Sequence, residues 1–203
     1  IEQSLRDHEA GIRMNAIRLA ELHLSASPAL VNALLPLQTD TDPKVRFQLL
    51  LTLGFVNTNE SANARNKLLF TDINDKWVQV AALSASSSQT APLLKVVLNK
   101  YRDDVPAYAS LVQRLTRMVG VSGTQQTIEQ LIQKSTSAAS GKQTSWQAPM
   151  LQGLAQGLES RKSKSPESVS AFDGQQSLLV KTFFEHSSPE VRHASLEMLK
   201  VIV

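Results

Sequence analysis

The sequence predicts an all-α fold, a superhelix of stacked antiparallel helix pairs. Three observations support this prediction. Apolar residues recur at three- and four-residue steps, helix-start signals recur at a 33-residue step, and one segment is apolar on nearly every helical face. With 203 residues, 42% hydrophobic and 5% aromatic, the chain has enough apolar surface for such a stack.

The repeat is clearest at the beginnings of its helical segments. Val45 is followed by Arg46, and Ile12 and Val78 stand 33 residues before and after Val45. The acidic residue three positions before each apolar residue keeps the same step, at Glu9, Asp42 and Asp75. A further copy near the C-terminus consists of Ser188, Pro189, Val191 and Arg192.

Each residue of this start signal has a physical task. Asp42 and Ser188 suit the N-cap, because their side-chain oxygens accept hydrogen bonds from open amides of the first turn. The following proline brings a preset φ to a position that needs no amide hydrogen. The helix after Asp42 should be buried on more than one side. Its apolar stripe is Val45, Leu49 and Leu53, and its other faces carry Phe47, Leu50 and Leu51.

Second helical patterns lie between these segments, each with one apolar and one polar side. An outer helix with one wet face has this pattern, so we expect two antiparallel helices in each unit, stacked into a continuous core. The patterns occupy 28–38, 62–70, 90–101 and 124–134.

The organisation is less regular after residue 100. A helix is expected over 106–119, and two polar stretches, 135–145 and 160–175, are expected to be loops. We predict one repeat domain over 1–203, with regular repeats at about 5–100 and less regular ones at 101–203. The chain lacks an initiator Met and stops inside an apolar helical pattern, so we expect a segment of a larger protein.

The D-P-x-V-R sequence from Asp42 to Arg46 resembles the start of a repeat in the HEAT family of armadillo-like α-solenoids. The T-P-L-H-x-A motif of ankyrin repeats and the W-x2-L-G-x2-Y motif of tetratricopeptide repeats do not occur. In HEAT arrays the arginine often pairs with an acidic residue of a neighbouring repeat. The resemblance therefore implies a structural ladder through Arg13, Arg46 and Arg192, with Gln79 as a gap.

Segments 12–24, 42–56, 72–86 and 146–158 are similar to the HEAT-repeat section of large bacterial membrane-bound dehydrogenase or haem-binding proteins. In those proteins a β-propeller precedes the repeats and a c-type cytochrome module follows them. The resemblance implies a non-catalytic scaffold in an extracytoplasmic or membrane-associated location. Its expected partners are proteins, either neighbouring domains of the same chain or a redox partner.

The residue content limits the chemistry. The absence of cysteine excludes disulfides, thiolate metal sites and a covalently attached c-type haem within these residues. His186 and His193 lack a third metal ligand, and Glu185, Glu190 and Glu197 fit a solvated helix face. We therefore expect no catalytic, cofactor-binding or metal site, and no apolar run is long enough for membrane insertion.

Two sets of residues are candidate partner contacts. Trp77 and Trp146 begin inner helices, where an exposed tryptophan can anchor a partner and a buried one fills space between repeats. The second set is a basic cluster in a serine-rich loop. A solubilising loop is the simpler interpretation of this cluster, which consists of Arg161, Lys162 and Lys164.

Two other function classes stay open. A free-standing nucleic-acid binder, resembling DNA glycosylases with HEAT-like repeats, needs a basic concave face. The net charge of +3 is mild, and positions 1–60 carry five basic and seven acidic residues, so nucleic acid is an improbable partner. An enzyme or chromophore lyase needs a polar cluster in the groove of the array, and the sequence does not locate one.

Overall fold

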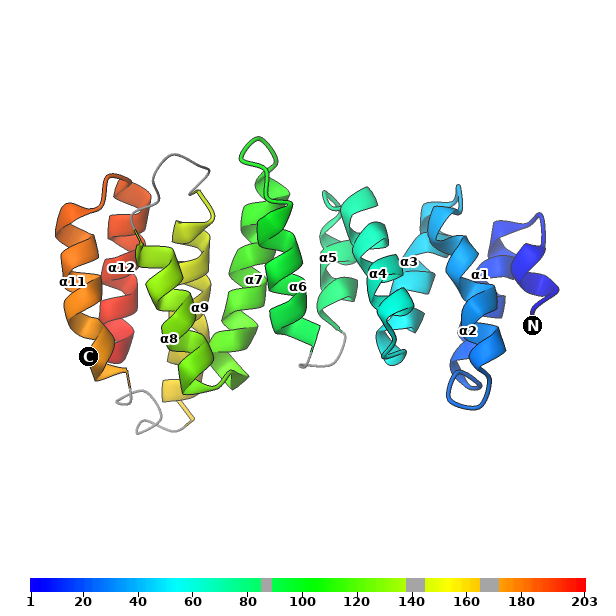
Figure 1. Cartoon of the computed structure of the whole chain (residues 1–203). Coiled ribbons are helices and arrows are strands. Elements are labelled where there is room, and N and C mark those ends of the chain that lie inside the picture. Colours follow the sequence, from blue (N-terminus) through cyan, green and yellow to red (C-terminus); the bar gives the residue numbers. More distant parts are fainter. Residues whose placement is uncertain (85–88, 138–144, 165–171) are drawn as a thin grey trace. The chain divides into compact units, whose positions relative to one another are not determined.

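The computed structural model describes residues 1–84, 89–137, 145–164 and 172–203. Every regular element in these ranges is a helix, which confirms the all-α prediction (Figure 1). The chain divides into two compact units, Ile1–Gln89 and Thr90–Val203. The single repeat domain over all 203 residues stays a prediction.

The first unit contains two rows of helices (Figure 1). In one row α3 packs between α1 and α5, and in the other α4 packs against η2, the 3-10 continuation of α2. The first row is α1 (Ala10–Glu21), α3 (Pro43–Thr52) and α5 (Lys76–Leu83). The second row is α2 (Pro28–Leu34), η2 (Leu35–Thr39) and α4 (Asn59–Thr71). Two short 3-10 turns, η1 (Ser4–Arg6) and η3 (Leu53–Phe55), precede α1 and follow α3.

The second unit has the same two-row organisation. Within it α9 packs between α7 and α12, and the companion helices pack against this row. The first row is α7 (Pro106–Ser122), α9 (Gln147–Lys162) and α12 (Pro189–Ile202). The companions are α6 (Thr90–Asn99), α8 (Gln125–Thr136) and α11 (Gln176–Glu185), the last preceded by η5 (Asp173–Gln175).

Side-chain caps begin three of the first-row helices, two of them, Asp42 and Ser188, as predicted. Asp42 Oδ1 accepts from the amide of Lys44 at 2.7 Å, and Asp75 Oδ1 accepts from the amide of Trp77 at 2.7 Å. Ser188 Oγ accepts from the Val191 amide at 3.3 Å. Each bond satisfies an amide that has no partner inside its helix.

The central helix α3 is covered on two sides and open on a third. Val45, Leu49 and Leu50 are buried, as is Leu53 in the following turn η3, whereas Phe47 and Leu51 are only half-buried. The predicted burial on more than one side is therefore correct.

The repeat positions around Val45 differ in burial. Val45 and its repeat equivalent Val78 are both buried, at 0% and 6% exposure. Ile12, the first member of the series, is 44% exposed, because apart from α3 the short turn η1 is the main element against α1.

The loops begin later than the sequence predicts. Helix α8 extends to Thr136 and α9 to Lys162, so the first residues of both predicted loops are helical. Ser135 and Thr136 stay in α8 because their hydroxyls donate to the carbonyls of Leu131 and Ile132, both at 2.8 Å. Residues 138–144 and 165–171 of these loops lie outside the described residues. Helix α11 was not predicted.

Glycines permit the close crossing of α7 and α9. A Cβ added to Gly120 on α7 would lie 2.8 Å from the carbonyl oxygen of Leu154 and 2.9 Å from Cα of Gly157. A Cβ at Gly157 would lie 2.8 Å from Cα of Gly120 and would overlap the Arg117 carbonyl oxygen. The two backbones are in contact here, with no room for a side chain on either helix.

Candidate functional site

One hydrogen bond recurs at the start of four first-row helices. In each case a side chain in the first turn donates to the carbonyl of the residue six positions earlier, which ties the preceding turn to the helix. We call this bond the carbonyl clamp. The clamps are Arg13 to Asp7 at 2.9 Å, Arg46 to Asp40 at 2.8 Å, Gln79 to Ile73 at 2.9 Å and Arg192 to His186 at 3.0 Å.

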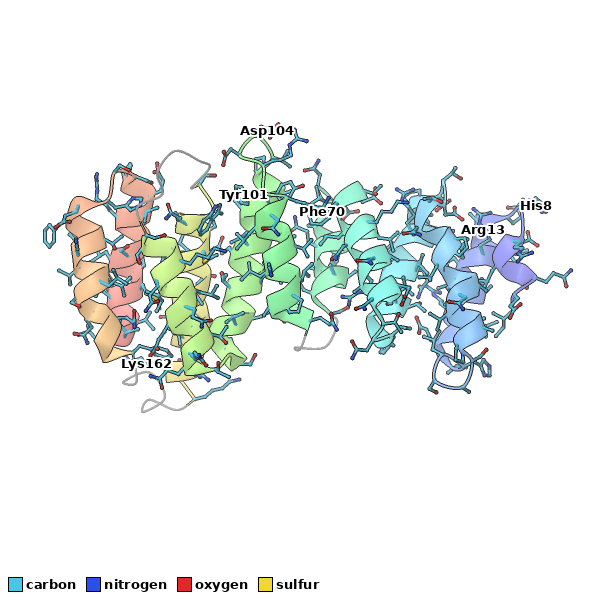
Figure 2. All side chains as sticks on the ribbon, viewed as in Figure 1. His8, Arg13, Phe70, Tyr101, Asp104 and Lys162 are labelled. Atoms are coloured by element: carbon cyan, nitrogen blue, oxygen red, sulfur yellow. The ribbon has the colours of Figure 1, made fainter. Side chains whose placement is uncertain are left out.

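Two of the clamping arginines also bind a carboxylate of the next hairpin. Arg13 donates from Nε and Nη2 to the two oxygens of Asp40, at 2.7 and 2.8 Å. Arg46 does the same with Asp72, at 2.9 and 2.8 Å (Figure 2 labels Arg13). This bidentate geometry is the strongest form of ion pair between side chains. The carboxylates therefore connect successive hairpins of the first unit.

The structure places the other predicted ladder residues differently. Gln79, expected as a gap, makes the carbonyl clamp through its side-chain amide. Arg192 makes the clamp but forms no ion pair within the described part of the chain. The carboxylates that pair with the arginines are Asp40 and Asp72, which were not predicted, whereas the repeat positions Asp42 and Asp75 cap their helices.

The environment of Asp40 favours its charged form. Burial alone raises the pKa of this carboxyl, since its side chain is only 5% exposed. The hydrogen bonds from Arg13 and the Asp42 amide, with the positive charges of Arg13 and Arg46, outweigh burial. The pKa of Asp40 therefore lies below its ordinary value.

This depressed pKa predicts an acid-sensitive contribution to stability. The contribution is fully present at pH values above the pKa of Asp40 in the unfolded chain, 3.8. It is lost as the pH falls through the lower pKa of Asp40 in the folded chain. Asp40→Asn should lower the free energy of unfolding by about 1 kcal/mol at pH 7. The difference between the two proteins should shrink as the pH falls from about 5 to 2. Urea unfolding across this range measures it, and a constant difference would contradict the assignment.

The clamp and the carboxylate bridge can be separated at Arg46. Arg46→Gln should keep a carbonyl clamp, as Gln79 does, and lose the bond to Asp72, lowering the free energy of unfolding by about 1 kcal/mol. Arg46→Met loses both and should cost about 2 kcal/mol. Chemical denaturation measures both variants. Equal losses would mean that the clamp contributes nothing.

The open side of the first row forms a groove of about 770 Å³. Its floor and rim come from the three helices α1, α3 and α5, from the end of α4 and from the turn before α5. The groove residues that matter for binding are Met14, Arg18, Lys44, Phe47, Leu51 and Trp77. This lining joins apolar and aromatic surface to a few polar groups, the usual composition of a binding site.

The groove residues fall into columns of the repeat. Met14 and Phe47 are 33 residues apart, and so are Lys44 and Trp77, and Arg18 and Leu51. On α3 the three columns are Lys44, Phe47 and Leu51, a spacing that puts them on one face of a helix. The groove is therefore built mainly from one face of the repeating helix, left uncovered on α1, α3 and α5.

A polar network forms the inner wall of the groove, between α1 and α3. Arg18 Nε donates to Gln48 Oε1 at 2.9 Å, and Gln48 Nε2 donates to Glu21 at 3.0 Å. Thr52 donates to the same Glu21 oxygen at 2.6 Å. Gln48 and Thr52 are buried, so these bonds fix the side chains that the groove presents. A second cavity of about 670 Å³ continues beyond Gln48 and Leu51.

The two tryptophans have different environments. Trp77 is 61% exposed at the groove, with the Lys76 ammonium 5.6 Å from its ring centroid. Trp146 is half-buried at the start of α9, with the Lys134 ammonium 5.6 Å from its ring centroid. Of the two tryptophans, Trp77 is therefore the one with an exposed ring.

The basic cluster is used mainly within the second unit. Arg161 Nη2 donates to the carbonyl of Gly123 at 3.0 Å, and Lys162 Nζ to the carbonyl of Val201 at 2.8 Å (Figure 2 labels Lys162). Both carbonyls lie at helix C-termini, where positive charge is stabilising. Lys164 is exposed.

Three findings concern other kinds of site. His186 Nδ1 accepts from the Ser188 amide at 3.1 Å, so this histidine supports the start of α12. No group of three His, Asp or Glu residues is placed to hold a metal ion within the described ranges. Within the same ranges no helix combines the length and apolarity needed to cross a bilayer.

Comparison with known protein families, with curated proteins and with solved structures finds no match for this chain.

Proposed function

We propose that this chain is a non-catalytic scaffold of HEAT-like repeats, a superhelix whose groove in the first unit holds another protein segment. The observation that carries the proposal is the repeat-register groove with the exposed Trp77 at its rim. Catalytic pockets draw groups from several unlike elements, whereas most of this surface is one helix face that recurs on α1, α3 and α5. Such surfaces suit the binding of extended protein segments.

The clamps support the scaffold part of the proposal. They fix the turn before four of the first-row helices, and the two bidentate pairs fix one hairpin against the next. Because neighbouring helices are held in this way, the groove residues keep their relative positions without a ligand. A preformed surface loses less conformational entropy on binding, which a module that holds partners in fixed relation needs.

The partners follow from the sequence resemblance. In the parent protein the repeats would connect a dehydrogenase-like β-propeller to a c-type cytochrome module, in an extracytoplasmic or membrane-associated location. The nucleic-acid alternative has less support. Arg161 and Lys162, the strongest basic candidates, already donate to backbone carbonyls.

The proposal is tested on the complete coding sequence. We expect a β-propeller before these residues and a C-x-x-C-H motif after them. The separately expressed flanking modules should then co-elute with this chain in size-exclusion chromatography with light scattering. If the flanking sequence encodes neither module, the redox placement is wrong, and if neither neighbour binds, the scaffold role is wrong too.

A further inference from the structure

The groove contains both positive and negative side chains, and these differ in how they are paired. Asp72 gives both carboxylate oxygens to Arg46, and Asp75 accepts from the amide of Trp77. The charge of Asp72 is therefore balanced by Arg46, whereas Asp75 caps its helix and keeps its charge.

The cations of the groove are not engaged in this way. Lys44 is exposed and makes no side-chain hydrogen bond or ion pair with the residues that the structure describes. Arg18 uses only its Nε, toward Gln48, and its two terminal nitrogens have no partner in the same part of the chain. Lys76 adds a third positive charge beside Trp77. With Asp72 paired to Arg46, Arg18 and Lys44 face only one unpaired carboxylate of the lining, Asp75, so the excess charge at the groove is positive.

The apolar part of the groove lies among these cations. Phe47 and Leu51 are half-buried, Met14 lies on the neighbouring helix, and Trp77 is exposed. A bound segment must offer apolar side chains to this floor and carboxylates to the rim. An amphipathic helix with acidic residues beside its apolar face meets both demands.

We propose that this groove binds an acidic amphipathic segment of a partner protein, with apolar side chains against Phe47, Leu51 and Trp77 and carboxylates toward Arg18 and Lys44. This inference rests on the proposed scaffold function and names the chemistry of its partner. A nucleic acid fits less well. The first unit carries eight basic and nine acidic residues over 1–89, so the charge outside the groove gives a long polyanion no further attraction.

The test measures fluorescence anisotropy of labelled peptides mixed with the full chain. The probe is a blocked amphipathic peptide with leucine and phenylalanine on one helical face and glutamate on the flanks. Two matched peptides replace every glutamate with glutamine or with lysine. We expect the glutamate peptide to bind at least about tenfold more tightly than the lysine peptide, and this preference to shrink in about 0.5 M NaCl.

Variants locate the binding. Trp77→Ala should weaken binding of the glutamate peptide by about tenfold or more, as expected for an aromatic anchor. Lys44→Gln and Arg18→Gln should each weaken it by about threefold, and the double variant by about tenfold. Lys67→Gln, an exposed lysine of α4, and Leu22→Ala, an exposed apolar residue, should leave it unchanged. Circular dichroism checks that each variant is folded.

The outcomes separate this inference from the scaffold proposal. Equal or tighter binding of the lysine peptide, or binding insensitive to Lys44 and Arg18, overturns the acidic partner and leaves the scaffold standing if the flanking modules co-elute. A labelled single-stranded oligonucleotide that binds through the same residues in place of the peptide overturns the inference. So does concentration-dependent self-association that Trp77→Ala abolishes, since a second copy would then be the occupant.

Discussion

Gly157→Ala should lower the free energy of unfolding of the second unit by about 3 kcal/mol. The new methyl group would lie 2.8 Å from Cα of Gly120 and would overlap the carbonyl oxygen of Arg117. Both are backbone atoms, so no rotamer change relieves the overlap and α7 and α9 must separate. The separation would also loosen the packing of α12 against α9. Urea unfolding followed by circular dichroism measures the loss.

Gly11→Ala is the matched control. This glycine is exposed in the first turn of α1, and a Cβ there would meet no atom within 4 Å. Alanine has the higher helix propensity, so the variant should be unchanged or more stable by up to about 1 kcal/mol. If the two glycine variants lost the same stability, the close crossing of α7 and α9 would be wrong.

Leu49→Ala should destabilise the first unit by about 3 to 4 kcal/mol. Leu49 is fully buried at the centre of α3, the helix that packs against both α1 and α5. Its truncation removes buried apolar contacts and leaves a cavity that the clamped helices on either side are poorly placed to fill. The thermal unfolding midpoint and the hydrogen exchange of residues 43–52 measure the effect.

Leu51→Ala, two residues away on the same helix, should behave differently. Leu51 is half-buried on the groove side, so its truncation should cost about 1 kcal/mol or less. The variant should nevertheless weaken binding of the glutamate peptide, because it removes part of the apolar floor of the groove. Equal destabilisation by the two leucine variants would mean that α3 is buried on all sides and that the groove does not exist.

The starts of α3 and α12 could be predicted from the sequence because their capping signals are local. Asp42 and Ser188 cap the turn that follows them, and the apolar stripe of α3 specifies its own buried side. The carboxylate rungs are not local. Asp40 and Asp72 follow their arginines by 27 and 26 residues, and only folding reveals that these side chains meet.

The groove was hidden for a different reason. From the sequence, Phe47 and Leu51 are expected to be further core residues. Periodicity shows that a helix face is apolar, but it does not show whether another element covers that face. The signal that was present is the alignment of Lys44 with Trp77 and of Met14 with Phe47 at the repeat step. Columns of this kind mark one continuous face. The late end of α8 was hidden because serine and threonine usually indicate loops, although here they bond back to their own helix.

The central claim is that the first unit consists of stacked, interchangeable hairpins, each with the same clamp and joined by the bidentate pairs. The most direct test duplicates residues 40–72 immediately after Asp72, which adds one clamp, one bidentate pair and one hairpin. Far-ultraviolet circular dichroism during thermal unfolding is the measurement. A repeat stack should gain helix signal in proportion to the added residues and unfold at an equal or higher midpoint. A loss of helix signal, or a lower midpoint, would show that the hairpins share one globular core and would contradict the claim.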